Sequence, residues 1–173
     1  MKMTDDTFAK LVAEDVKNKV TPSSRKMLME RPNWERWERA LIALVENLNG
    51  QLEDIESDIE SDKERYTDIE DGQVLLTEAL AAYESRKKKI ERFRFHVESR
   101  LADVSKMIET GLPMEDDIMN KMMLLTKAIK KHKEMLHEYT IEATAIDRAL
   151  WDVLEGRWSF DGIRESDLAE LSV

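Results

Sequence analysis

Cross-linking and chain-breaking residues are scarce in this 173-residue chain, which has no cysteine, three prolines and five glycines. The absence of cysteine excludes disulfides, thiolate metal ligands and thiol nucleophiles. Sandwiches, barrels and doubly wound sheets need many turns, and so few glycines and prolines can hardly supply them. Long helices are therefore the expected structure.

Long apolar runs are also missing. The longest run, Ala40 to Val45, is far shorter than the roughly 20 residues that span a bilayer, and the first residues, MKMTDDTF, lack the apolar stretch of a signal peptide. We therefore expect a cytoplasmic protein with no membrane partner. Acidic residues outnumber basic ones by 37 to 27, and the net charge of −10 disfavours nonspecific binding to nucleic acid.

Apolar residues recur every three or four positions in three long segments, which are separated by Asp71-Gly72 and by residues 110–113. The first segment runs from Trp34 to Ile69 after an N-cap at Asn33. The second runs from Leu76 to Ile108 with Gly111 as its C-cap, and the third runs from Ile118 to Val153 and is closed by Gly156. Short connections make neighbouring helices antiparallel, and a 3.5-residue repeat favours supercoiled packing. The predicted fold is all-α, an elongated antiparallel three-helix bundle that resembles a coiled coil.

The segments outside this bundle divide the chain into three parts. Residues 1–33 are predicted to form a short helical element, residues 34–156 the bundle, and residues 157–173 a C-terminal docking tail. The apolar stripe of the first part needs a partner surface, either in the same chain or in another. The tail is too short to fold alone, so it must dock on the bundle or stay mobile.

Charge is unevenly distributed along the first two helical segments. Residues 51–71 contain ten acidic and two basic side chains, whereas residues 86–100 contain seven basic and two acidic ones. Folding the hairpin about Gly72 places residue i beside residue 143 − i. The cations from Arg86 to Arg92 then lie level with the carboxylates from Glu53 to Asp58. We expect these pairs to fix the register more than to stabilise the fold, because exposed ion pairs contribute little.

Folding the second hairpin about Leu112 brings like charges together in a mid-bundle basic belt. One interpretation is an anion-binding or acidic-partner site made by Arg92, Arg94, His96, Lys127, Lys130, Lys131 and Lys133. The alternative, which we favour, is a polar layer that sets the register and consists of Asn49, Gln51, Arg94 and His132. Nucleic-acid binding has less support, because few aromatic residues lie among these cations.

Signals for catalysis and metal binding are weak. A single Glu-x-x-His pair, Glu134 and His137, is insufficient for a di-metal centre, which needs two such pairs and two further glutamates. The sequence has no phosphate-binding glycine loop and no nucleophile elbow, and its carboxylates lie on solvated helical faces. We therefore expect no catalytic residue, no metal site and no cofactor, and we predict that the protein is not an enzyme.

Several large apolar residues suggest either a core or a protein-binding surface. Trp34 and Trp37 share one helical face, and they are core residues unless they form a hot spot for a partner. In each segment the apolar residues spaced three or four positions apart form a line along the helix, which we call the seam. Met119 and Met123 lie beside the seam of the third segment and widen its apolar stripe. With two aromatic residues of the tail, the candidate partner-binding set is Trp34, Trp37, Met119, Met123, Trp158 and Phe160.

Two stretches, NWERWERAL (33–41) and YESRKKKIERFRFHVESRL (83–101), are similar to small helical proteins of unassigned role that are encoded by phages of actinobacteria. The resemblance covers about 30 of the 173 residues and carries no catalytic motif. It implies an accessory role inside an infected bacterial cell, in the host cytoplasm, and it assigns no functional residue.

These observations predict a noncatalytic helical protein that binds another protein and associates with itself as a homo-oligomer. One alternative is a nucleic-acid or phosphate binder that uses the basic belt. Another is a phage assembly or scaffolding component.

Overall fold

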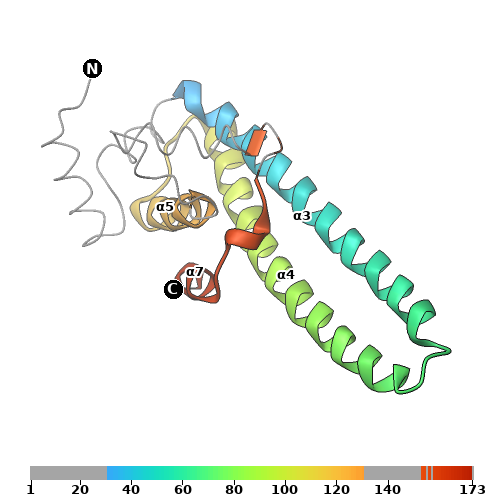
Figure 1. The fold of residues 1–173 in the computed structure, drawn as a ribbon. Coiled ribbons are helices and arrows are strands. Elements are labelled where there is room, and N and C mark those ends of the chain that lie inside the picture. Colours follow the sequence, from blue (N-terminus) through green and yellow to red (C-terminus); the bar gives the residue numbers. More distant parts are fainter. Residues whose placement is uncertain (1–30, 131–152, 155, 157, 173) are drawn as a thin grey trace, which may run out of the picture.

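A computed structural model describes residues 31–130, 153, 154, 156 and 158–172 (Figure 1). The described part contains the helices α3 (Arg31–Tyr66), α4 (Gly72–Thr110), α5 (Asp116–Lys130) and α7 (Glu165–Leu171), and the 3-10 turn η2 (Phe160–Gly162). It contains no strand, so the all-α prediction is confirmed. Most of the predicted N-terminal element, residues 1–30, lies outside the described residues.

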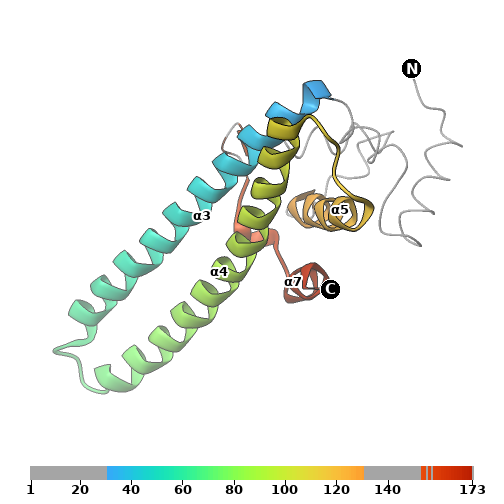
Figure 2. The ribbon, with the colours of Figure 1, turned by 180° about the vertical axis from the view of Figure 1, so that it is seen from behind.

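Helices α3 and α4 form a long antiparallel hairpin, which both views of the ribbon show (Figures 1 and 2). With 36 residues, α3 is about 54 Å long at the usual helical rise. The two helices are joined across the hairpin by Ser105 Oγ, which donates to Glu38 Oε2 at 2.9 Å, and by Lys87 Nζ, which lies 3.7 Å from Glu56 Oε1. In both pairs the residue numbers add to 143, so the predicted register is confirmed.

The turns at the two ends of α4 explain why glycine occupies positions 72 and 111. Asp71, and not Gly72, takes the left-handed conformation, with a φ of 58°. Gly72 is required because a Cβ there would lie 2.1 Å from the Tyr66 carbonyl oxygen. At the other end of α4, Gly111 has a φ of 71°, and its N–H donates to the Met107 carbonyl at 2.9 Å, as expected for a C-cap.

The ends of α3 differ from the prediction. The helix begins at Arg31, so Asn33 lies inside it and is not its N-cap, and the helix ends at Tyr66 instead of Ile69. Prediction from apolar spacing misplaces such ends because a seam pattern can continue into the residues that flank a helix.

Helix α5 does not run alongside the hairpin. It begins with the expected acidic turn of Asp116 and Asp117, but Figures 1 and 2 show it nearly end-on while α3 and α4 lie across the page. A third antiparallel rod is therefore not confirmed for residues 116–130, and residues 131–152 lie outside the described part. The reason is the burial pattern: seven of the eight residues from Met122 to Ile129 are buried, so α5 is enclosed on several sides and does not bury a single stripe.

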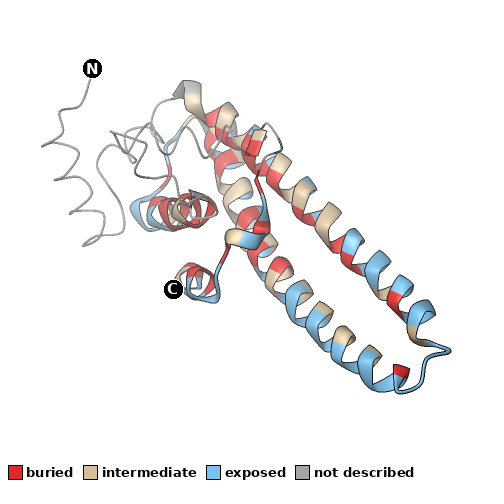
Figure 3. Cartoon of the chain, in the orientation of Figure 1, coloured by how far each residue is buried: buried red, intermediate tan, exposed pale blue. Residues whose placement is uncertain are grey.

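The hydrophobic core occupies one end of the hairpin. Buried side chains are concentrated near α5 and the C-terminal segment, and most of the other end is exposed (Figure 3). We call residues 53–85 the distal arm. Within the arm only Ile55, Asp62 and Gly72 are buried. The molecule thus consists of a packed body and a projecting two-helix arm.

The C-terminal tail docks on the body. Its large apolar residues are all buried, so the segment 158–172 is packed against the rest of the chain: Trp158, Phe160, Ile163, Leu168 and Leu171. Gly156, which was expected to close the third helical segment, has a φ of 72°, and its N–H donates to the Val153 carbonyl at 3.0 Å.

Candidate interaction surfaces

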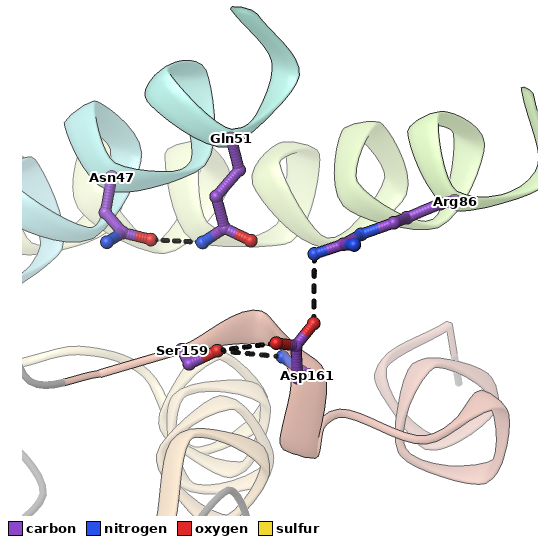
Figure 4. Close-up of polar contacts among 5 residues, drawn as sticks. All are labelled: Asn47, Gln51, Arg86, Ser159 and Asp161. Carbon is purple, nitrogen blue, oxygen red and sulfur yellow. Dashed lines mark hydrogen bonds and ion pairs between the residues drawn. The ribbon is translucent and has the colours of Figure 1, made fainter. Parts of the chain in front are cut away.

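The basic run of α4 is neutralised from two directions. Lys87 pairs with α3 as expected, but Arg86 Nη2 donates to Asp161 Oδ1 at 2.9 Å (Figure 4). Glu165 accepts from Arg92 Nη2 at 2.5 Å and lies 3.9 Å from Lys89 Nζ. Besides the carboxylates of α3 that the register predicts, the C-terminal segment supplies two further ones, Asp161 and Glu165.

An aromatic contact holds the same segment against α4. The rings of Phe93 and Trp158 are stacked, with centroids 5.7 Å apart and an interplanar angle of 12°, and Phe160 lies 5.8 Å from Phe93. The Trp158 Nε1–H donates to the Ile129 carbonyl of α5 at 3.1 Å. Trp158 therefore links α4 to α5.

The predicted basic belt is not assembled as expected. It required α5 to run back along α4, and α5 crosses the hairpin instead. Arg92 is paired with Glu165, and Arg94 Nη1 donates to Asn49 Oδ1 at 2.8 Å. Lys127 lies on α5 and is half-buried, the side chain of Lys130 is not described, and Lys131 and Lys133 lie outside the described residues.

His96 is the belt residue with a shifted pKa. Partial burial lowers the pKa of His96 below its ordinary value, and the charges of Arg100 and Arg92 add to this effect. The lowered pKa favours the neutral imidazole over the cation.

Two members of the predicted polar layer meet across the hairpin, namely Arg94 and Asn49. Gln51 does not join them, because its Nε2 donates to Asn47 Oδ1 one turn earlier in α3 (Figure 4). His132 lies outside the described residues. The contact across the hairpin agrees with the expected register, since 94 and 49 also add to 143.

The six candidate partner-binding residues do not form an accessible surface. All of them are buried, with at most 5% of each side chain exposed: Trp34, Trp37, Met119, Met123, Trp158 and Phe160. Their burial favours the core interpretation over the hot-spot interpretation. The widened stripe of α5 and the aromatic residues of the tail are covered within the chain, so they are core residues.

Three of the six exposed large apolar residues of the described chain lie at the tip of the distal arm, and the other three are Ile42, Phe95 and Leu112. Ile69, Val74 and Leu75 are 48%, 59% and 44% exposed. The signal for them was available, because Val74 and Leu75 precede the first seam position, Leu76, and lie outside the strict repeat. Contiguous exposed apolar residues of this kind often mark binding surfaces.

The distal arm also carries the net charge of the molecule. Residues 53–85 contain 12 acidic and 2 basic residues, a net charge of −10. The rest of the chain contains 25 residues of each sign and is balanced. The exposed apolar residues of the tip are therefore surrounded by an acidic field.

A polar contact inside the arm joins its two helices. Tyr83 Oη donates to Asp62 Oδ2 at 2.7 Å, and the Asp62 side chain is buried. This hydrogen bond raises the pKa of Tyr83, and burial and the negative charge of Asp62 act in the same direction. The contact fixes the pairing of the two helices where apolar burial is smallest.

A cleft of about 330 Å³ lies at the turn between α4 and α5. Within its lining, Thr110 Oγ1 donates to the Lys106 carbonyl, and Asp103 Oδ2 lies 2.9 Å from Nε of Arg100, which is outside the lining. Among the described residues, no three histidine, aspartate or glutamate side chains come together to hold a metal ion. The Glu134–His137 pair lies outside those residues.

Comparisons with known proteins give no relative for this chain: no family model, no curated protein and no solved structure matches it. None of the described helices combines the length and the apolarity needed to cross a bilayer.

Proposed function

We propose that this chain is a noncatalytic helical protein that acts by binding another protein through its distal arm. The observation that carries the proposal is that three exposed apolar residues, Ile69, Val74 and Leu75, lie within seven positions of one another at the tip of the arm. The exposed apolar residues of the body, Ile42, Phe95 and Leu112, are far apart in the sequence. A long arm that projects from the packed body presents its surface to a partner without disturbing the core (Figure 3).

The seam of the arm is only partly covered. Leu41, Leu44 and Leu48 of α3 are buried in the body, where further elements pack on the hairpin. In the arm, the equivalent seam residues Ile59 and Leu80 are only half-buried. Two helices alone leave part of their apolar seam exposed to solvent. A third helix would bury much of this remaining apolar area and thereby stabilise a complex.

A nucleic-acid or phosphate binder has less support. Arg86 and Arg92 already hold carboxylates of the C-terminal segment, and the arm repels phosphates with a net charge of −10. Self-association through the arm is also disfavoured, because it would bring two such charges together. We therefore favour a different protein as the partner over a second copy.

The resemblance to proteins of actinobacterial phages indicates the kind of cell in which this binding would take place. An accessory role in an infected cell would use the arm to bind a phage or host protein. Assembly or scaffolding is one form that such binding could take.

Site-specific photo-cross-linking tests the proposal. A photoreactive phenylalanine analogue replaces Val74 in the arm, or Phe95, which is 64% exposed on α4 outside the arm, as the matched control. In the cells that naturally contain the protein, we expect position 74 to form an adduct with one other protein, with and without nuclease treatment. Absence of that adduct, or equal adducts at both positions, would contradict the proposal.

A further inference from the structure

One face of α4 continues from the body into the distal arm. Residues 75, 79, 82, 86 and 93 are separated by three, four or seven positions, so they share this face. At the body end, Trp158 and Phe160 cover Phe93, and Asp161 binds Arg86. The C-terminal segment therefore already uses this face as a docking surface.

Beyond Arg86 the same face is open. Leu75 is 44% exposed, Ala82 is exposed and Ala79 is half-buried. From Gly72 to Tyr83 the helix has a single charged residue, Glu78. The uncovered part of the face is thus apolar, and its two alanines leave room for the close approach of another helix.

Carboxylates of α3 lie on the same side of the hairpin as this face. Asn47 and Gln51 lie on the side of the hairpin that faces Asp161 (Figure 4). Asp54 and Asp58 follow them at spacings of three and four residues, which places all four residues on one side of α3, and both aspartates are exposed. In the register in which paired residue numbers add to 143, Asp58 is level with Ser85, close to Ala82, whereas Asp54 is level with Lys89 in the covered part of the face.

We propose that Leu75, Ala79 and Ala82, with Asp58 at the body end of this stripe, form the docking site for an amphipathic helix of another protein. That helix carries apolar residues along one side and lysine or arginine next to them. The inference rests on the proposed function, and it specifies the face of the arm and the chemistry of its partner. The docked helix extends the covering of α4 that the C-terminal segment begins, and it completes a local three-helix bundle.

Charge selects this occupant over others. The net charge of −10 on residues 53–85 attracts a basic helix and repels an acidic one. A second copy of the arm brings the same negative charge and is therefore a poor occupant.

The test uses two synthetic peptides with the full chain. The first is a fluorescein-labelled peptide of three heptads with leucine at the a and d positions and lysine at the flanking positions. The second peptide has glutamate in place of every lysine. In fluorescence anisotropy at physiological salt, we expect the basic peptide to bind at least about tenfold tighter than the acidic peptide.

Matched variants locate the site. Ala82→Gln places a long polar side chain on the proposed face, whereas Ala81→Gln places it about 100° round the helix on another exposed position. We expect A82Q to weaken binding of the basic peptide about tenfold and A81Q to change it less than about twofold. Asp58→Asn should weaken binding more than Glu53→Gln, which removes an exposed carboxylate on another side of α3.

Three results would overturn the inference: equal binding of the two peptides, equal effects of A82Q and A81Q, or a dimer of the chain that A82Q dissociates and A81Q does not. The last result would assign the face to a second copy. The cross-link at position 74 reports on the proposed function independently. If it persists when the peptides do not discriminate, the arm binds a protein of another chemistry.

Discussion

At the scale of single residues, Trp158 connects the C-terminal segment to both α4 and α5. Its ring stacks on Phe93 of α4, and its N–H donates to the Ile129 carbonyl of α5. The indole thus contacts α4 through its ring and α5 through its N–H. One side chain fixes two elements that share few other contacts.

We expect Trp158→Leu to destabilise the protein by about 2–4 kcal/mol, because it removes a buried ring and leaves the Ile129 carbonyl without this donor. Urea unfolding followed by circular dichroism measures the loss. Phe95→Leu is the control, since Phe95 is 64% exposed, and it should stay within about 0.5 kcal/mol of the parent chain. Equal losses in the two variants would contradict the role given to Trp158.

Residue-level prediction succeeded where a side chain's environment depends on its own helix and the neighbouring one. The seam leucines Leu41, Leu44 and Leu48 are buried as their spacing predicts. Met119 and Met123 show the limit, because spacing reveals that they are apolar and near a seam but not what covers them. They are buried because α5 is enclosed, which no local pattern indicates.

At the scale of elements, α7 depends on its contacts with α4. Seven residues are too few for an independent helix in water. Leu168 and Leu171 are buried, and Glu165 at its first turn pairs with Arg92 and Lys89 of α4. The hydrogen bond from Arg92 lowers the pKa of Glu165, and the charges of Arg92 and Lys89 add to this effect.

The lowered pKa of Glu165 gives the anchoring of α7 a defined pH dependence. A carboxyl group whose pKa is lower in the folded state stabilises that state above its unfolded pKa, here 4.5, and loses the contribution as the pH falls through the folded value. We expect Glu165→Gln to speed hydrogen exchange of α7 amides several-fold at pH 7, measured by mass spectrometry. The difference from the parent chain should disappear once the pH falls below the folded pKa.

Glu170→Gln is the matched control for this prediction. It removes a half-buried carboxylate from the same helix, and we expect little change in exchange. A difference between Glu165→Gln and the parent chain that persisted at low pH would show that the charge of Glu165 does not anchor α7.

At the scale of the whole molecule, stability is expected to be uneven. The body joins α3, α4, α5 and the C-terminal segment in one hydrophobic core, whereas the distal arm buries only Ile55, Asp62 and Gly72. Regions with few buried apolar contacts open at a lower free energy than the core. The arm is therefore the part of the molecule best able to adjust to a partner.

We expect backbone amides of residues 56–85 to exchange at least about tenfold faster than those of residues 37–52 and 90–107, because the arm lacks the covering elements of the body. Hydrogen exchange of the full chain with peptide-level mass spectrometry measures the gradient. Uniform protection along the hairpin would contradict it and would mean that the arm is covered in solution.

The sequence by itself determined the hairpin of α3 and α4, including its register. The apolar repeat selects helices, the short turn at Asp71-Gly72 makes them antiparallel, and opposite charges favour pairs such as Lys87 and Glu56. These factors act between near neighbours or across one turn, so they can be deduced from spacing. The positions of α5 and of the C-terminal segment cannot be deduced in this way.

Only the tertiary structure decided the crossing of α5 and the docking of the tail. The contacts that set them join Phe93, Ile129 and Trp158, which are far apart in the chain. Apolar spacing states which side of a helix is buried, but it does not state the angle at which that side meets a neighbour. Which apolar faces are covered, and which face of the arm is left open, therefore follows from packing and not from the sequence pattern.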